Sequence, residues 1–174
     1  MKLKSGLSER GIQSLIDGVE KYRRDIEKKI ETLLRELVTY GVTVCRAEAL
    51  DLSINNTGKL VSSITGETNG SKGYVRVNCE YAVYIEFGTG VVGEKNPHPN
   101  YGGYTLGYNY DHNGHGELGW WYPTDESDPN PYKSRAEDGT LYAWTRGIPS
   151  RPFMYNTAKK MEEYIRALKG GGNA

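Results

Sequence analysis

The chain has 174 residues, with 22 basic and 22 acidic side chains, so its formal net charge is zero. This length suits one domain with a substantial core, and 37% hydrophobic and 25% charged residues exclude a disordered chain. Neutrality argues against a dedicated nucleic-acid-binding protein, and we expect no membrane span and no signal peptide. Cys45 and Cys79 stand alone in the sequence and are expected to be buried thiols.

The neutral total conceals an uneven distribution of charge. Residues 1–91 carry a net charge of +1, residues 92–140 a net of −5, and residues 141–174 a net of +4. Residues 92–147 also hold 10 of the 19 aromatic residues, including 7 of the 14 tyrosines. We therefore interpret residues 1–174 as a single domain that carries residues 92–147 as an aromatic and glycine-rich insertion.

A long helix is predicted in the first part of the chain, because apolar residues recur there at steps of three and four. The apolar positions are Ile12, Leu15, Val19, Tyr22, Ile26, Ile30, Leu33, Leu37, Tyr40 and Val44. This spacing predicts an amphipathic helix from about residue 12 to residue 40, with Gly41 bending it before a second segment to about Leu50. The stripe approximates a heptad, so a coiled-coil dimer is one alternative. We favour packing on the protein's own sheet.

Two strands and a short helix are expected next. Residues 55–58 are typical of a turn, and residues 60–65 and 73–78 are predicted to form an antiparallel hairpin through a turn at 69–72. Residues 81–87 are compatible with a strand or a short helix ended by Gly88, and we favour the helix.

A second long helix is predicted at the end of the chain. Ser150 is expected to cap it, with Pro152 in the first turn. Met154, Met161 and Leu168 are expected to lie on one apolar face.

Three motifs, preceded by the long helix, resemble those of a known family. They are Thr57-Gly58-Lys59-Leu60 leading to Ser63-Ile64, the block from Tyr81 to Thr89, and Arg151-Pro152-Phe153-Met154 at the start of the last helix. Together they are similar to the neck or tail-completion proteins of tailed bacteriophages, also described as minor tail components or head–tail joining proteins. The matching residues are Gly58, Leu60, Ser63, Ile64, Tyr81, Ala82, Tyr84, Glu86, Phe87, Gly88, Thr89, Arg151, Pro152 and Phe153.

The resemblance implies an α+β fold, in which a long N-terminal helix and a C-terminal helix pack on a small antiparallel sheet. It implies a structural protein of a virion, prophage or phage-tail-like bacteriocin, without enzymatic activity or cofactors. Such proteins form a ring at the head–tail junction or at the head-proximal end of the tail. The implied partners are further copies, with sixfold symmetry, and other neck and tail proteins such as a connector, stopper, tail tube or sheath. The resemblance further implies DNA only as passing cargo, no membrane partner, and assembly in the host bacterial cytoplasm.

Glu86 is the unusual member of the matching residues, since it is an acid among apolar neighbours. A buried carboxylate needs a partner, and we expect Thr89, Arg151 or a basic residue of a neighbouring subunit to supply it. We interpret Glu86 as structural, because no second acid, base or metal ligand accompanies it in the sequence. Six apolar residues are expected to seal the helices and the sheet: Leu60, Ile64, Tyr81, Ile85, Phe87 and Phe153.

The insertion supports two further interpretations. Trp120, Trp121, Tyr122, Tyr142 and Trp144 are expected to pair in a two-stranded hairpin and to contact other subunits. Because flat rings beside polar residues also stack on sugars, a cell-wall carbohydrate-binding module is the alternative function.

Two remaining features of the insertion carry weaker expectations. His112 and His115 lie in a Gly- and Asn-rich stretch that predicts a solvated loop more strongly than a metal site, and His98 adds little. The acidic segment 92–140 and the basic last helix are complementary, as in the head-to-tail contacts that close rings.

Overall fold

The computed structural model describes residues 8–51, 58–100, 108–111 and 113–170. The helices are α1 (Glu9–Asp51), α2 (Lys59–Ser62), α3 (Ala82–Phe87), α4 (Gly90–Lys95) and α5 (Phe153–Gly170), with a 3-10 helix η1 (Gly116–Leu118). The strands are β1 (Ile64–Asn69), β2 (Lys72–Val77), β3 (Trp120–Thr124), β4 (Lys133–Arg135) and β5 (Leu141–Thr145). This mixture confirms the α+β class. Among the described helices, none is long and apolar enough to cross a membrane.

Helix α1 is one helix of 43 residues that continues through Gly41. The predicted bend at Gly41 is therefore wrong, and the glycine has another role. A Cβ atom at this position would lie 2.7 Å from the sulfur of Met161 and 2.8 Å from a methyl group of Val75. Gly41 thus lets α5 and β2 approach α1 closely at the same point.

The first predicted strand is wrong over its first half, because residues 59–62 form the short helix α2 and β1 begins only at Ile64. The left-handed backbone of Gly58, with φ of 72°, starts this helical turn, which buries the side chain of Leu60. Strands β1 and β2 then form the predicted antiparallel hairpin, in register from Ile64 opposite Val77 to Asn69 opposite Lys72. The turn expected at residues 55–58 lies mostly outside the described residues.

The core lies where the C-terminal half of α1 meets the hairpin, α3 and the start of α5. Of the six residues expected to seal these elements, Leu60, Ile64, Ile85 and Phe153 are buried, and Tyr81 and Phe87 are partly buried. Cys45 and Cys79 are both buried and free, as expected. Burial raises the pKa of the Cys45 thiol to about 11.

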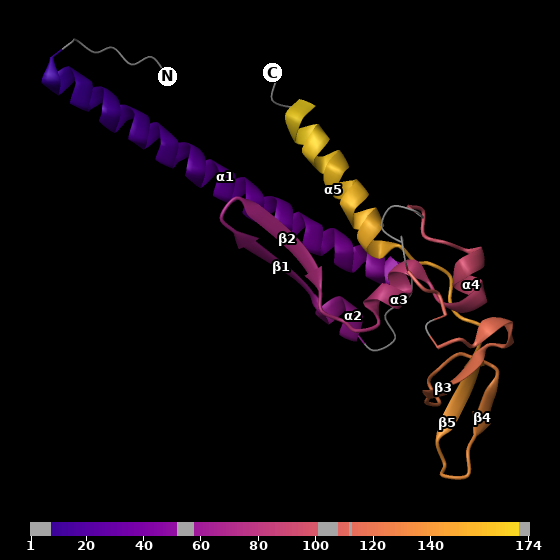
Figure 1. Ribbon diagram of the computed structural model, residues 1–174. Coiled ribbons are helices and arrows are strands. Elements are labelled where there is room, and N and C mark those ends of the chain that lie inside the picture. Colours follow the sequence, from indigo (N-terminus) through magenta and orange to yellow (C-terminus); the bar gives the residue numbers. More distant parts are fainter. Residues whose placement is uncertain (1–7, 52–57, 101–107, 112, 171–174) are drawn as a thin grey trace.

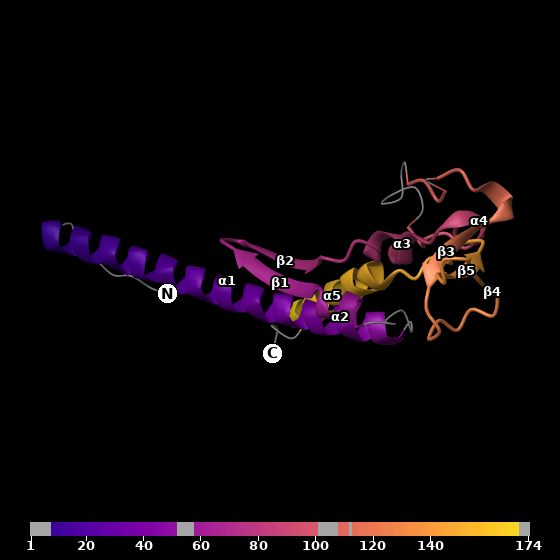
Figure 2. The ribbon, with the colours of Figure 1, turned by 90° about the horizontal axis from the view of Figure 1, so that it is seen from below.

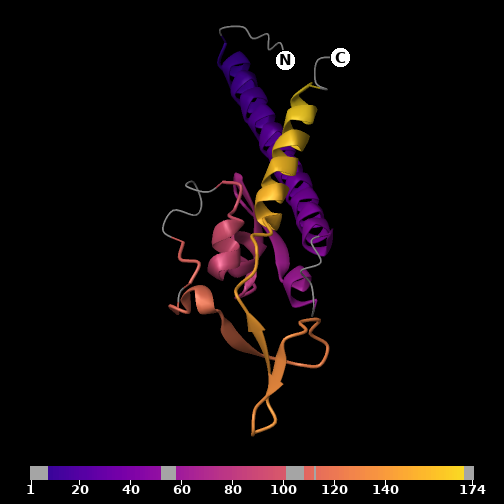
Figure 3. The same ribbon diagram turned by 90° about the vertical axis from the view of Figure 1, so that its right-hand side faces the viewer.

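Helix α5 runs back along α1 from the core. The rings of Tyr40 and Tyr164 stack with centroids 4.3 Å apart, and Glu48 of α1 accepts a hydrogen bond from the amide of Asn156 at 2.9 Å. Beyond these contacts the C-terminal end of α5 points away from α1 (Figures 1 and 3).

Residues 9–33 of α1 extend beyond both the hairpin and α5 (Figure 2), and we call this segment the arm. At 1.5 Å per residue the arm is about 37 Å long. Eight apolar side chains of the arm are between 38% and 53% exposed: Ile12, Leu15, Ile16, Val19, Tyr22, Ile26, Ile30 and Leu33. The expectation that the stripe packs on the protein's own sheet is therefore wrong for the arm and holds only further along α1.

The insertion forms a second, three-stranded sheet at the end of the molecule far from the arm (Figure 1). Its strand order is β3-β5-β4, so the expected two-stranded hairpin gains β4 as an additional edge strand. Strands β3 and β5 pair as expected, with Trp121 opposite Trp144.

Candidate functional site

Helix α3 carries the most specific part of the phage-like block and confirms the predicted helix at residues 81–87. It ends at Gly88, whose φ of 82° is in the left-handed region. A Cβ atom at Gly88 would lie 2.7 Å from the backbone nitrogen of Ser150 and 2.8 Å from the carbonyl oxygen of Ile148. Glycine is therefore required here both for the backbone angle and for the close approach of the segment that leads into α5.

The carboxylate of Glu86 caps the N-terminus of α5. Its Oε2 accepts the N–H of Met154 and its Oε1 accepts the N–H of Tyr155, both at 2.9 Å. The first N–H groups of a helix have no partner within the helix, and the helix dipole favours an anion at this end. Ser150, the predicted cap, instead donates its hydroxyl to the carbonyl oxygen of Glu86 at 2.6 Å, so that prediction is wrong.

His98 completes this arrangement. Its Nε2 lies 3.1 Å from Oε1 of Glu86, and its Nδ1 accepts the N–H of Asn100 at 3.1 Å. The hydrogen bonds thus assign a neutral ring that carries its proton on Nε2 and donates it to the carboxylate. His98 is 2% exposed and Glu86 is 8% exposed. The carboxylate of Glu86 therefore accepts three hydrogen bonds, one from the ring of His98 and two from backbone N–H groups of α5.

Neither His98 nor the N-terminus of α5 was among the partners expected for Glu86. The sequence offers only a histidine between two prolines, which does not reveal what the ring contacts. Thr89 has a different role, because its N–H donates to the carbonyl oxygen of Ile148 at 2.9 Å and its carbonyl oxygen accepts the N–H of Ile148 at 3.2 Å. This pair joins the end of the block to the segment between β5 and α5. The carbonyl oxygen of Pro152 accepts the N–H of Asn156 at 2.9 Å, so this proline lies just before α5.

The aromatic residues of the insertion differ in their surroundings. Trp121 is 51% exposed, whereas the other four aromatic candidates are partly buried. Trp120 stacks on His115 with ring centroids 4.7 Å apart, and Trp144 meets the ring of Tyr132 edge-on at 6.3 Å. The hydroxyl of Tyr122 donates to Asp128 at 2.8 Å. Trp121 therefore presents the largest free ring surface among these five candidates.

A groove of about 1150 Å³ lies between α3 and the second sheet, and we call it the aromatic groove. It brings together motif residues and insertion residues that are far apart in the sequence. Its lining includes Tyr81, Tyr84, Thr89 and Arg151 from the motifs, Trp120, Trp121 and Tyr122 from β3, and the acidic residues Asp111 and Asp128. Tyr142 and Trp144 do not line it. Leu60 and Ile64 lie in the core at α2 and β1, and the partly buried Ser63 lies between these elements; none of the three lines this groove.

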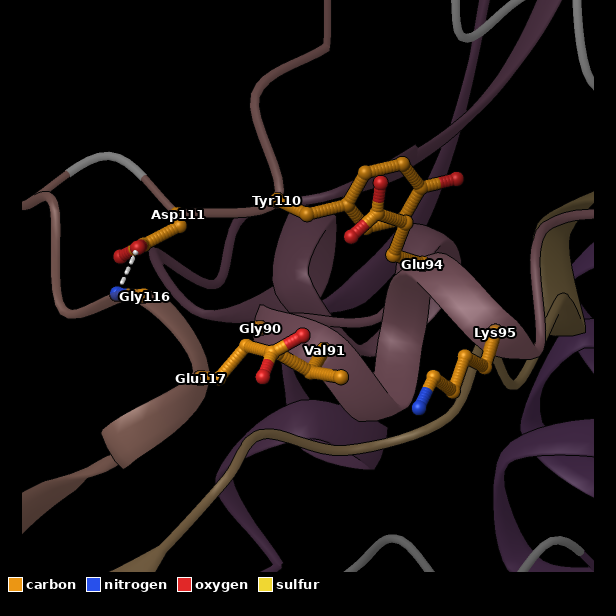
Figure 4. A pocket seen from close by; sticks show the side chains of 8 residues that line it. All are labelled: Gly90, Val91, Glu94, Lys95, Tyr110, Asp111, Gly116 and Glu117. Carbon is orange, nitrogen blue, oxygen red and sulfur yellow. Dashed lines mark hydrogen bonds between the residues drawn. The ribbon is translucent and has the colours of Figure 1, made fainter.

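A smaller cavity of about 430 Å³ lies between α4 and η1 (Figure 4). Its acidic lining residues are Glu94, Glu117 and Asp111. The carboxylate of Asp111 already accepts hydrogen bonds from the backbone N–H groups of Gly116 at 2.6 Å and His115 at 2.9 Å. These two backbone hydrogen bonds hold the pKa of Asp111 below its usual range. Within the part of the chain that the structure describes, no three potential metal ligands come together. His112 lies outside the described residues.

Comparison with known proteins identifies one family. The model of the family described as "Bacteriophage HK97-gp10, putative tail-component" matches residues 13–88. No curated protein and no solved structure matches the chain. The matched segment begins in the arm and ends at Gly88, and it leaves the insertion and α5 outside. From residue 13 in the arm to Gly88 at the end of α3, the chain is thus similar to this family of bacteriophage tail components, which confirms the resemblance found in its sequence.

Proposed function

We propose that the chain is a structural subunit of a phage tail or tail-like particle. In this proposal it forms a ring at the head–tail junction or at the head-proximal end of the tail, where it joins or completes the tail. The similarity of residues 13–88 to tail components supports the tail assignment. The observation that carries the ring is the shape of the subunit, which has an exposed apolar arm at one end and an aromatic groove at the other (Figure 1).

Two different surfaces at opposite ends favour head-to-tail contacts. Such heterologous contacts close into a ring when the rotation between neighbouring copies is a simple fraction of a turn. The family resemblance implies six copies, with other neck and tail proteins above and below. The neutral net charge suits a ring that lets DNA pass without holding it.

The same proposal treats the chain as one domain with residues 92–147 inserted. Its support is the backbone pairing of Thr89 with Ile148 and the hydrogen bond from the N–H of Gly90 to the carbonyl oxygen of Tyr110 at 2.7 Å. The first pair joins the end of the α3 motif to the residue that follows the insertion, and the second bond joins the start of α4 to a residue within the insertion. The virion, after assembly in the host cytoplasm, is the proposed location. The role is structural, in keeping with the engagement of Glu86 as a helix cap.

Native mass spectrometry of the purified full chain, alone and with its neighbouring tail proteins, tests this proposal. We expect a closed oligomer of one size, with six copies, and a ring in negative-stain images of the same sample. A chain that stays monomeric under both conditions would contradict the ring.

The aromatic groove favours a second candidate function, the binding of cell-wall carbohydrate. Exposed rings at Tyr84 and Trp121 lie there beside Asn109 and Asp128, and such a combination can stack on and hydrogen-bond a sugar. Calorimetry with cell-wall oligosaccharides tests it. Saturable binding that disappears in Trp121→Ala would support this candidate, and the absence of any heat of binding by the wild-type protein would reject it.

A further inference from the structure

We infer that the arm of one copy binds in the aromatic groove of a second copy. This arm-in-groove contact is the head-to-tail joint of the oligomer, so the inference rests on the proposed self-assembly and specifies the surfaces that carry it. The two surfaces in contact are the apolar stripe of residues 12–33 on one copy and the aromatic groove between α3 and β3 on a second copy of the same chain.

No other element among the described residues covers the apolar face of the arm. Its stripe continues the line along which α5 packs further down α1, where Met161 covers Gly41 and Tyr164 stacks on Tyr40. Where α5 turns away, the same spacing of apolar residues continues, and no described helix or strand packs on it (Figures 1 and 3). An isolated helix of this length is marginally stable in water, and most helical stability in proteins comes from packing an apolar face. Eight exposed apolar side chains in 25 residues therefore indicate a surface that is buried in the assembly.

The aromatic groove has the size and lining that such a helix face requires. Amphipathic helices commonly bind by laying an apolar face with anchors at i, i+3 or i+4, and i+7 into an apolar groove. Val19, Tyr22 and Ile26 have this spacing at the middle of the arm. For a helix about 10 Å in diameter, a groove of about 1150 Å³ accommodates the side chains of two to three turns. The exposed rings of Tyr84 and Trp121 are suitable contact surfaces for these anchors.

The middle of the arm and the groove carry opposite net charges. The arm as a whole is neutral, with six basic and six acidic side chains, but its middle, residues 21–29, contains five basic and two acidic side chains, a net charge of +3. The groove is lined by two acids, Asp111 and Asp128, and one base, Arg151, and one side of it belongs to the segment 92–140, whose net charge is −5. Opposite charge across an interface steers association and selects the register. Two arms that packed on each other in parallel would instead bring these like-charged segments together.

The geometry also separates this contact from contacts within one chain. The arm and the second sheet lie at opposite ends of the molecule (Figure 1), and α1 as a whole is about 65 Å long. The arm therefore reaches the groove of a neighbour and not its own. Each copy then offers one free arm and one free groove, as a ring or an open chain of subunits requires.

Sedimentation velocity on full-length variants tests the inference. The arm variant is Val19→Glu with Ile26→Glu, and the groove variant is Tyr84→Ala with Trp121→Ala; all four positions are exposed, so the fold is expected to persist and is checked by circular dichroism. The matched arm control, Gln13→Glu with Thr32→Glu, adds the same charge away from the stripe. The groove control is Tyr132→Ala, which removes an exposed ring outside the groove. We expect both test variants to shift the assembly midpoint to at least tenfold higher concentration and both controls to assemble like wild type.

Mixing the two test variants gives the decisive result. An equimolar mixture retains one intact arm and one intact groove per pair, so we expect it to form a heterodimer that does not grow further. Arm-to-arm pairing predicts instead that the groove variant assembles alone and that the mixture forms no heterodimer, and either result would overturn the inference. If the wild-type protein and the groove variant assemble equally well, the arm-in-groove contact is rejected, but the proposed ring is not. A wild-type chain that remains monomeric rejects both.

Discussion

Replacement of Glu86 by glutamine should weaken the fold through the N-terminus of α5. The carboxylate accepts hydrogen bonds from the N–H groups of Met154 and Tyr155 and from His98, and it is almost fully buried. A glutamine keeps one acceptor oxygen, so its NH₂ group must face a donor, and one buried N–H loses its partner at a cost of about 1–3 kcal/mol. Loss of the anion at a partly buried helix terminus adds up to about 2 kcal/mol. We expect Glu86→Gln to lower the free energy of unfolding by about 2–4 kcal/mol.

Urea unfolding followed by tryptophan fluorescence measures this change, at a protein concentration below that of assembly. Glu163→Gln is the matched control, because this exposed side chain lies on the same helix and should leave the urea midpoint unchanged. The slope of the transition should stay the same in both variants. A Glu86→Gln protein within about 0.5 kcal/mol of wild type would refute the conclusion that this carboxylate holds α5 in place.

Four further predictions follow from the same geometry. Phe153→Ala should lower the free energy of unfolding by about 3–5 kcal/mol, because this ring is fully buried; near-unchanged thermal melting would contradict its place in the core. Gly88→Ala should destabilise the fold far more than Gly139→Ala in the same assay, because both glycines have positive φ but a Cβ is in steric conflict only at Gly88. Burial raises the pKa of Cys45 from 9.0 to about 11, so the folded state keeps this proton up to a higher pH than the unfolded state does. The free energy of unfolding should therefore fall between pH 9 and pH 11, and this fall should be smaller in Cys45→Ala. Trp121→Ala should impair assembly more than monomer stability, and the reverse order would exclude a docking role for this ring.

The sequence predicts the elements that depend on local signals. The 3.6-residue period defines α1, and the turn at residues 69–72 defines the β1–β2 hairpin. The α3 block is recognisable because its residues match a family pattern. Each of these signals lies within a short stretch of chain.

The predictions that are wrong share a physical cause, since they concern contacts between distant segments. The low helix propensity of glycine predicts a bend at Gly41. The structure instead needs a residue without a side chain there, so that α5 and β2 can approach α1 closely. Ser150 reads as a cap, but Glu86, 64 positions earlier, supplies the acceptor. Periodicity likewise identifies the apolar stripe of α1 without indicating that, among the described residues, only its C-terminal half is covered. His98 has no sequence signal for its partner at all.

An electron-microscopy map of the assembled particle, with this chain located by a fused tag, tests the central claim most directly. The account predicts one closed ring of this chain at the head-proximal end of the tail, with the arm of each copy lying in the groove of its neighbour. Density for the tag at the distal tip of the tail, or its absence from purified particles, would contradict the proposed role.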